Sequence, residues 1–511
     1  MAHWADEVAD QILSKEGARH VISTGISPSG EIHIGNLREV LTADAIYRVL
    51  VERGVAVDFH YIADNADPLR RVYPFLDAAT YEPLIGRPIS RIPCPCGAHR
   101  SYSEHFHEPF LRTLEELHVP VRIFRADEVY SSGRMNALIV AALKGAGRIA
   151  EILHEETGRR VEEGWSPFNP LCDACGRVNQ ARVTGFDAGR ETVDYFCECG
   201  HRGTLPMAGG GKLTWRVDWP ARWKLFGVTV EPFGKDHASR GGSYDTGVRI
   251  VREIFGGAPP FPVPYEWISL KGQGDMSSSK GNVLSIGQML EVVPAEVLRY
   301  LVVRSQPMRA IQFDPGRPLL KLVDEYDDLE SASRDDRSLA LSKAGGFEPL
   351  GVPFAHLVTV VQIAGGDLDE TARVLERNGY RNLDRTSLAR RVEYARRWIE
   401  RFAPEDMRFS VQEVLPRAAA ALDSAQTRFL GFLASRLADG MNAEAVHKAI
   451  YDAAAEVPGA KPAALFEAIY VALLGQRNGP RAGWFITFLG LPFCVRRFRE
   501  AAAPARDITT A

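Results

Sequence analysis

Two segments of the chain carry residues that suit chemistry on a phosphorylated ligand. The first contains His33 and Asn36, three residues apart, after a run of small residues. If a strand turns into a helix here, both side chains share a face of the first helical turn and can donate hydrogen bonds. The free N–H groups of a helix N-terminus also favour phosphate. The segment is therefore a candidate triphosphate site, with a tight turn and an incidental histidine as the alternative.

The second segment is a loop rich in glycine and serine that runs from Gly272 to Asn282. Its lysine, Lys280, could neutralise the charge that develops on a departing pyrophosphate. The serine hydroxyls and backbone N–H groups would add hydrogen-bond donors. Taken alone, the segment would be interpreted as a solvated loop. The functional interpretation requires that it folds against the first segment, so that both embrace one triphosphate.

The two segments together resemble the HIGH and KMSKS motifs of class I aminoacyl-tRNA synthetases. The first reads HIGN, so Asn36 stands where the family has a second histidine; it can still donate to phosphate but cannot become a cation. The second has Asp275 in place of the family's first lysine, and Lys271 or Lys235 is close enough in sequence to substitute. The resemblance implies catalytic roles for His33, Asn36 and Lys280, and an ATP site made of Pro28, His33, Gly35, Asn36, Met276, Ser277, Ser279 and Lys280.

Longer stretches resemble the class I lysyl-tRNA synthetases in particular. They cover roughly residues 3–320 in the family's order and read TGISPSGEIHIGN, YIADNADPLRRVYPFL, RVDWPARW, EPFGKDHASRGGSYDTG and DMSSSKGN. The resemblance implies that L-lysine is activated with ATP and Mg²⁺ to lysyl-adenylate and passed to the terminal ribose of tRNA(Lys). It also implies a lysine pocket lined by Gly25, Ser27, Trp219, His237 and Tyr265.

The chemistry of a lysine substrate adds one residue to this pocket. An ammonium group needs a carboxylate or an aromatic face, and Asp218 and Trp219 could supply the pair. The alternatives are that the aromatic residues belong to the core and that Asp218 pairs with Arg216 or Arg222. Asp64 and Asp67 follow a predicted strand, where they either orient a substrate or the tRNA end, or cap the next turn.

Six of the seven cysteines come in close pairs, which in a reducing compartment suggests metal binding rather than disulfides. The pattern C-x₂-C followed by C-x-C predicts a structural Zn²⁺ with tetrahedral ligands at Cys172, Cys175, Cys197 and Cys199. A second set, for which ordinary turn chemistry is the alternative, could hold another Zn²⁺ and consists of Cys94, Cys96, His99 and His105, with His107 nearby.

The elements that must position these residues follow from the spacing of apolar residues. Residues 19–24 and 55–63 are β-prone, and between them the apolar residues of 36–52 recur at helical spacing. Such a βαβ unit implies a parallel sheet, beyond whose carboxyl ends ligands bind. The pattern resumes with a strand at 228–233, a helix near 244–255 and a strand at 263–268.

The predicted fold is an α/β Rossmann-like catalytic domain with a zinc-ribbon-like insertion, followed by an all-α C-terminal helical bundle. Many arginines of the last part, among them Arg391 and Arg497, could contact phosphate, with a salt-bridged solvated face as the alternative. We expect the catalytic domain at 1–90 and 208–275, the cysteine-rich insertion at 91–207, the clamp loop and a connecting stem-contact region at 276–330, and, by resemblance, an anticodon-binding domain at 331–511.

The composition is that of an ordinary soluble protein, with 45% hydrophobic residues, 25% charged residues and a net charge of −4. No apolar run is long enough for a membrane span, and the N-terminus does not resemble a secretory signal. We therefore expect a cytoplasmic enzyme whose partners are tRNA(Lys), L-lysine and ATP, and neither DNA nor a membrane. The rivals are a class I synthetase for glutamate, which an arginine-lined pocket would favour, an inactive synthetase-like tRNA-binding protein, and a nucleotidyltransferase that makes a cofactor.

Overall fold

The computed structural model describes residues 2–14, 19–276, 283–332 and 335–503. The chain forms two compact units. The first consists of Met1–Leu290, Pro294–Phe313 and Asp335–Phe347, and the second of Glu291–Val293, Asp314–Arg334 and Glu348–Ala511. The first unit therefore holds both candidate phosphate-binding segments and all six paired cysteines. Within the described residues, no helix has the length and apolar character that crossing a membrane requires.

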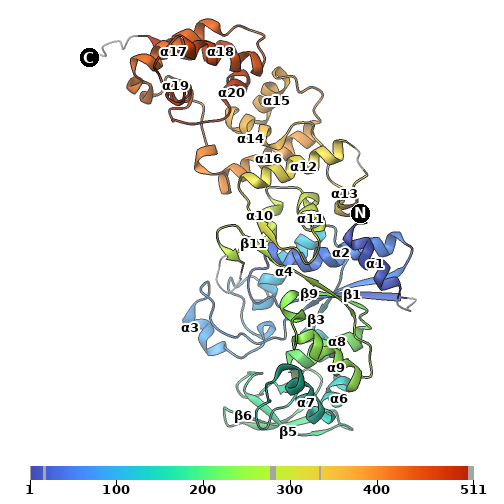
Figure 1. The fold of residues 1–511 in the computed structure, drawn as a ribbon. Coiled ribbons are helices and arrows are strands. Elements are labelled where there is room, and N and C mark those ends of the chain that lie inside the picture. Colours follow the sequence, from blue (N-terminus) through green and yellow to red (C-terminus); the bar gives the residue numbers. More distant parts are fainter. Residues whose placement is uncertain (1, 15–18, 277–282, 333–334, 504–511) are drawn as a thin grey trace. The chain divides into compact units, whose positions relative to one another are not determined.

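A five-stranded parallel sheet forms the centre of the first unit (Figure 1). This confirms the parallel sheet that the βαβ pattern predicts. One strand of this sheet, β3, lies within 91–207, the range predicted to be the insertion. The sequence does not predict this strand, because its four residues RIFR are too short and polar to form an apolar pattern. The strand order is β10-β9-β1-β2-β3, with β1 at Arg19–Ile26, β2 at Ala56–Ala63, β3 at Arg122–Arg125, β9 at Val230–Gly234 and β10 at Phe261–Tyr265.

The remaining elements of the first unit surround this sheet. Its α-helices are α1 (Trp4–Leu13), α2 (Leu37–Glu52), α3 (Ala78–Tyr81), α4 (Tyr102–Glu116), α5 (Ala126–Ser131), α6 (Asn136–Lys144), α7 (Ala146–Thr157), α8 (Trp215–Phe226), α9 (Ser243–Glu253), α10 (Ile286–Leu290), α11 (Ala295–Val303) and α13 (Arg337–Ser342). Three small sheets join β11 (Ile268–Leu270) to β12 (Gly274–Asp275) and β13 (Ile311–Phe313), β4 (Phe168–Pro170) to β8 (Gly211–Leu213), and β5 (Ala181–Asp187) to β6 (Thr192–Cys197) and β7 (Arg202–Pro206).

Helices α2 and α8 cover opposite faces of the central sheet (Figure 1). Consecutive side chains of a strand point to opposite faces. On β2, the ring of Phe59 lies 5.9 Å from Tyr47 of α2, whereas the ring of His60 lies 5.7 Å from Phe226 of α8. The sheet is therefore buried on both sides, and its ligand-binding edge is the one beyond the carboxyl ends of its strands.

The second unit contains helices joined by loops and, among its described residues, no strand, as the alanine- and arginine-rich sequence predicts. Two of its arginines are buried: Arg391 is 4% exposed and bonded to Asp327, and Arg497 is 1% exposed. The prediction that these two contact phosphate is wrong, because their guanidinium groups donate hydrogen bonds to other residues of the same unit. The α-helices are α12 (Arg317–Ser331), α14 (Phe354–Ile363), α15 (Leu368–Arg377), α16 (Arg385–Arg401), α17 (Ser424–Arg436), α18 (Ala443–Ala455), α19 (Pro462–Leu474), α20 (Ala482–Leu489) and α21 (Leu491–Ala502).

Candidate active site and metal-ligating clusters

The first candidate segment forms a reciprocal cap between β1 and α2, after a loop in which Pro28 is buried. His33 precedes the short 3₁₀ turn η1 (Ile34–Asn36), and its Nδ1 accepts a hydrogen bond from the Gly35 N–H at 3.1 Å. The Oδ1 of Asn36 accepts from the N–H of His33, also at 3.1 Å. Because η1 takes up Asn36, helix α2 begins one residue later than the apolar spacing predicts.

This cap leaves each of the two side chains with a hydrogen-bond donor. Since Nδ1 of His33 accepts, the proton of the neutral ring sits on Nε2, and Asn36 keeps both N–H groups of its amide. Burial lowers the pKa of His33 to about 4, so the ring is uncharged at neutral pH. Gly35 has no room for a side chain, because a Cβ there would lie 2.8 Å from the His33 ring. The segment can therefore donate to an anion without carrying a cationic side chain.

The second candidate segment meets the first on both of its flanks. On one flank, the Cε atom of Met276 lies 3.4 Å from where a Cβ of Gly35 would be. On the other flank, the carbonyl oxygen of Leu284 accepts a hydrogen bond from the Ile34 N–H at 3.0 Å. Next to this bond, His33 and Ser285 form an antiparallel β-bridge. The three remaining residues assigned to this part of the ATP site lie outside the described residues: Ser277, Ser279 and Lys280.

A cavity of about 150 Å³ opens beyond the carboxyl ends of β1, β9 and β10. One wall is aromatic, with the ring of Trp215 stacked on that of Trp219 at 5.5 Å. Two further tryptophans, Trp223 and Trp267, also line it. The structure thus gathers four of the residues assigned to the lysine pocket around one space: Gly25, Trp219, His237 and Tyr265.

Two glutamates line this cavity that the sequence did not single out, Glu39 and Glu231. Glu39 accepts hydrogen bonds from the Gly25 N–H at 2.8 Å and from the Tyr265 hydroxyl at 2.7 Å, and burial raises its pKa to about 7. Glu231 is 5% exposed, and its Oε1 accepts from the indole N–H of Trp219 at 2.8 Å. Its Oε2 has no hydrogen-bond partner among the described residues, and burial raises the pKa of Glu231 well above its usual range.

Each glutamate had a signal in the sequence. Glu39 lies three residues after Asn36, so it shares a helical face with a residue already assigned to the site. Glu231 interrupts the apolar run VTVEPF of a strand, and a carboxylate in a strand buried on both faces needs a partner. These signals single out two acids, but only the packing of α2 and α8 on the sheet brings them to one cavity.

Asp218 does not reach the cavity and is not the carboxylate that faces it. The residue is fully buried on α8, where its carboxylate accepts hydrogen bonds from the Tyr130 hydroxyl and from Arg222. Lys212 also lies close, with its Nζ 3.6 Å from the Asp218 carboxylate. The alternative that Asp218 pairs with Arg222 is therefore confirmed. The physical reason is that residues four apart on one helix meet directly, while the cavity faces the neighbouring side chain Trp219.

Asp64, Asp67 and Lys212 extend this ion cluster from α8 to the end of β2. Lys212, on β8, donates to Asp64 at 3.0 Å and also to Asp67. Burial alone would raise the pKa of Asp64, but Arg222 and Lys212 outweigh it and hold that pKa well below the usual range. Ser27, assigned to the lysine pocket, donates to Asp67 at 3.0 Å and is absent from the cavity lining. The two aspartates thus bind the cations of this cluster.

The cysteine pairs expected to hold a structural zinc come together beside the β5-β6-β7 sheet. The Sγ atoms of Cys172 and Cys199 lie 3.7 Å apart, and so do those of Cys175 and Cys197. All four sulfurs are within 4.8 Å of one another. A tetrahedral zinc with Zn–S bonds of ~2.3 Å separates its sulfurs by about 3.8 Å. The four thiols therefore fit the dimensions of a tetrahedral Zn²⁺ site.

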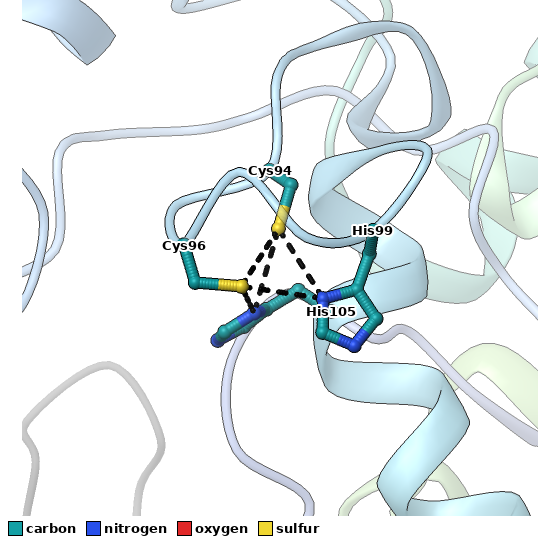
Figure 2. Close-up of side chains that lie close together, drawn as sticks. All are labelled: Cys94, Cys96, His99 and His105. Carbon is teal, nitrogen blue, oxygen red and sulfur yellow. Dashed lines mark hydrogen bonds between the residues drawn. The ribbon is translucent and has the colours of Figure 1, made fainter.

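The second set is gathered as closely, at the N-terminal end of α4. Figure 2 shows the side chains of Cys94, Cys96, His99 and His105 pointing toward a common centre. The Nδ1 atoms of both histidines lie 3.2–3.6 Å from the two sulfurs. The other nitrogen of His99 lies 3.5 Å from Glu108, an arrangement common around metal-bound histidines. His107 stays outside this set, since its ring stacks on Tyr61.

Comparisons with known proteins place the chain in a family. The family model described as tRNA synthetases class I (K) matches residues 2–344. A lysine–tRNA ligase of Methanosarcina barkeri is 50% identical, with 99% of each chain aligned. A lysine–tRNA ligase of Archaeoglobus fulgidus is 49% identical over 98% of this chain and 100% of its own, and one of Thermoplasma acidophilum is 39% identical over 97% and 98%.

The matched range 2–344 contains the reciprocal cap at His33, the cavity beyond the parallel strands and both metal-ligating clusters. The relatives extend the match through the helical second unit, because they align with nearly the whole chain. On this evidence, the chain belongs to the family of class I tRNA synthetases (K).

Proposed function

We propose that the protein is a lysine–tRNA ligase, which activates L-lysine with ATP and transfers it to tRNA(Lys). Relatives that carry this name over their full length support the proposal. The observation that carries it is a pair of carboxyl groups in one tryptophan-lined cavity, that of the half-buried Glu39 and that of the buried Glu231. Lysine has two ammonium groups, one at each end of an apolar stem, and each needs a negative partner once it leaves water.

Glutamate, the main rival substrate, fits this cavity poorly. Its side-chain carboxylate would meet Glu39 and Glu231 rather than a cation. Among the described residues that line the cavity, Arg222 carries the permanent positive charge, and it is already bonded to Asp64 and Asp218. A second carboxylate would therefore be desolvated and repelled, whereas the aromatic walls favour the stem and ammonium of lysine.

The ATP site that we propose is built on the cap at His33. The Nε2–H of His33 and the amide of Asn36 would donate to the triphosphate, with Gly35 leaving space beside the backbone and Met276 closing one side. The proposed site also includes Pro28, Ser277, Ser279 and Lys280. The family uses ATP, and Mg²⁺ accompanies its phosphates, chiefly through phosphate and water oxygens.

In this reaction the protein supplies position and charge stabilisation and no nucleophile. The lysine carboxylate attacks the α-phosphorus, the bond to the β-phosphate oxygen breaks, and pyrophosphate leaves. A hydroxyl of the terminal ribose of tRNA then attacks the acyl carbon, and AMP leaves. His33 and Asn36 would stabilise charge on the phosphates in the first step, and Lys280 would neutralise the departing pyrophosphate.

Both Cys/His clusters are proposed as structural zinc sites. Cys172, Cys175, Cys197 and Cys199 would hold one ion, and Cys94, Cys96, His99 and His105 the other. The donor sets suit Zn²⁺, and neither set lines the proposed lysine cavity. Metal analysis of the purified protein should find two zinc ions per chain, and one in a Cys172→Ser/Cys175→Ser variant.

The helical second unit is proposed to bind the anticodon region of the tRNA. Exposed arginines of α16 supply positive charge there, with the Arg396 side chain 58% exposed and that of Arg397 39% exposed, although both also pair with Glu393. Phosphate contacts of this kind weaken as salt rises. The proposal therefore predicts that the affinity for tRNA(Lys) falls with salt, and falls less steeply for an Arg396→Ala variant.

A charging assay tests the function directly. The full-length protein is incubated with total tRNA, ATP and each labelled amino acid in turn, so that activation and transfer are tested together. We expect lysine to be incorporated and glutamate not. Incorporation of glutamate or another amino acid would replace the substrate assignment. Charging by none of them, with tRNA still bound, would favour the inactive tRNA-binding rival.

A further inference from the structure

Helix α4 touches the candidate ATP site and a metal-ligating cluster at the same end. Tyr102, its first residue, has no exposed surface, and its hydroxyl donates a hydrogen bond to the carbonyl oxygen of Ser29 at 2.7 Å. Ser29 lies in the loop that leads from β1 to the cap at His33. A buried tyrosine hydroxyl needs such a partner, so the bond ties this loop to the first turn of α4.

The same turn of α4 is attached to the cluster of Cys94, Cys96, His99 and His105. His105 lies three residues after Tyr102, so the two share a helical face. The ring of Phe106 joins them, with centroids 4.6 Å from His105 and 5.1 Å from Tyr102. A metal held by these four residues would therefore fix the position of the turn that carries Tyr102.

The rest of α4 packs against α10, the helix that follows the second candidate segment. The Cγ2 atom of Thr113, on α4, lies 3.9 Å from where a Cβ of Gly287 would be. Helix α4 thus contacts the first ATP-binding segment at one end and the element after the second segment along its length.

We infer that Tyr102 is a positioning residue for ATP, and that the metal cluster at Cys94 acts through it to hold the loop at Ser29 in its binding conformation. The inference rests on the proposed function and assigns the cluster a role beyond local folding. Tyr102 is fully buried and does not line the proposed lysine cavity; it holds the backbone that precedes His33 and Asn36, the two proposed hydrogen-bond donors to phosphate. Loss of its hydroxyl should therefore affect ATP binding while the metal and the fold stay in place.

The test compares two tyrosine-to-phenylalanine variants of the full-length protein. Tyr102→Phe removes the bond to Ser29. Tyr81→Phe is the control: the ring of Tyr81 packs against that of Tyr102, but its hydroxyl donates to the carbonyl oxygen of Pro93 at 3.0 Å and not to the loop at Ser29. We expect Tyr102→Phe to raise KM for ATP about three- to tenfold, the range for one hydrogen bond, while KM for lysine and the zinc content stay unchanged and the protein remains folded. Tyr81→Phe should leave KM for ATP unchanged.

A second measurement tests the coupling between the cluster at Cys94 and the loop at Ser29 without measuring enzyme activity. Amide hydrogen exchange over residues 27–35 is followed in the free protein with its zinc, after chelation, and in Tyr102→Phe. Exchange there should become faster in both altered samples, and chelation should add little to Tyr102→Phe, because both break the same connection. Unchanged exchange and an unchanged KM for ATP in Tyr102→Phe would overturn the inference while lysine charging by the wild type upheld the proposed function. Absence of charging by the wild type would instead remove the proposed function.

Discussion

The backbone N–H of Ile34 donates a hydrogen bond to the carbonyl oxygen of Leu284, 3.0 Å away. Ile34 lies within the first candidate segment, between His33 and Asn36, and Leu284 lies two residues after the end of the second. The bond therefore brings together two parts of the chain that are far apart in sequence, and does so without side chains, so it does not depend on which residues the motifs contain. This contact is what the proposed ATP site requires, since both segments would have to reach the same triphosphate.

Replacing Glu231 with glutamine should weaken lysine binding. The change keeps the shape of the side chain and an oxygen for the indole N–H of Trp219, but an amide, unlike the carboxyl group, cannot ionise when an ammonium group binds beside it. An unpaired buried ammonium costs several kcal/mol, so KM for lysine should rise by at least about tenfold while KM for ATP changes little. Steady-state charging kinetics measure both constants.

Glu266→Gln serves as the matched control for this variant. Glu266 follows the cavity residue Tyr265, but its carboxylate pairs with Lys235 at 2.9 Å and does not line the cavity. The Glu266→Gln variant should have a KM for lysine within about twofold of the wild-type value. Equal effects of the two variants would contradict the assignment of Glu231.

Lysine binding should strengthen as pH rises through about 7, the pKa to which burial raises Glu39. Below that pH the carboxyl is protonated and cannot neutralise an ammonium group. The raised pKa also means that Glu39 contributes stability to the free protein below its unfolded pKa, and that this contribution is lost as pH rises through the folded pKa. Bound lysine supplies a positive charge beside the ionised Glu39 and should therefore restore the stability that is lost at higher pH.

Thermal unfolding with and without excess lysine measures this effect. The increase in Tm caused by lysine should be larger at pH 8 than at pH 6. His33 should not contribute, because its pKa of about 4 keeps it neutral over this range. A Glu39→Gln variant should lose the difference between the two pH values; if the variant retained it, another group would be responsible.

Replacing His33 with alanine should slow adenylate formation. The variant loses the proposed Nε2–H donor to the triphosphate, and donors of this type are worth about 10²- to 10³-fold in rate. Single-turnover formation of lysyl-adenylate should fall by that order, whereas transfer from preformed lysyl-adenylate to tRNA should be little affected. Lys280→Ala should likewise slow the formation of lysyl-adenylate and have little effect on transfer to tRNA. A uniform loss in both steps, with a lowered Tm, would indicate a structural role instead.

Replacing Lys212 with methionine should destabilise the first unit. Lys212 is 5% exposed and contacts three carboxylates, those of Asp64, Asp67 and Asp218. Removing one partner of a buried ion cluster costs about 3–5 kcal/mol in the free energy of unfolding. Chemical denaturation measures the loss, and adding Asp64→Asn should recover part of it.

Lys224→Met is the control for Lys212→Met. Lys224 is an exposed lysine of α8 whose Nζ donates to the carbonyl oxygen of Gly256 at 3.0 Å. Its replacement should cost less than about 1 kcal/mol. A similarly small cost for Lys212→Met would show that the buried cluster adds nothing to stability.

Local patterns in the sequence determined much of this protein. Alternating helical and β-prone runs predict the βαβ unit of β1, α2 and β2, and the resemblance of HIGN and DMSSSKGN to known motifs predicts the chemistry. The cysteine spacings predict the close pairs within each candidate metal set, because residues two or three positions apart cannot lie far apart in space, whereas the meeting of Cys175 with Cys197 depends on the fold. Such predictions succeed because periodicity and short spacing act within one element or one turn.

Only the tertiary structure decided which carboxylates face the cavity. Asp218, on α8, and Glu231, on β9, are both buried acids, yet Asp218 is bonded to Arg222 and Tyr130, while Glu231 keeps one oxygen unpaired beside Trp219. The difference depends on how α8 is rotated against the sheet, which is set by packing between distant residues. Whether a charge is paired or left facing a cavity is a property of that packing and of the water it excludes, and no local pattern encodes it.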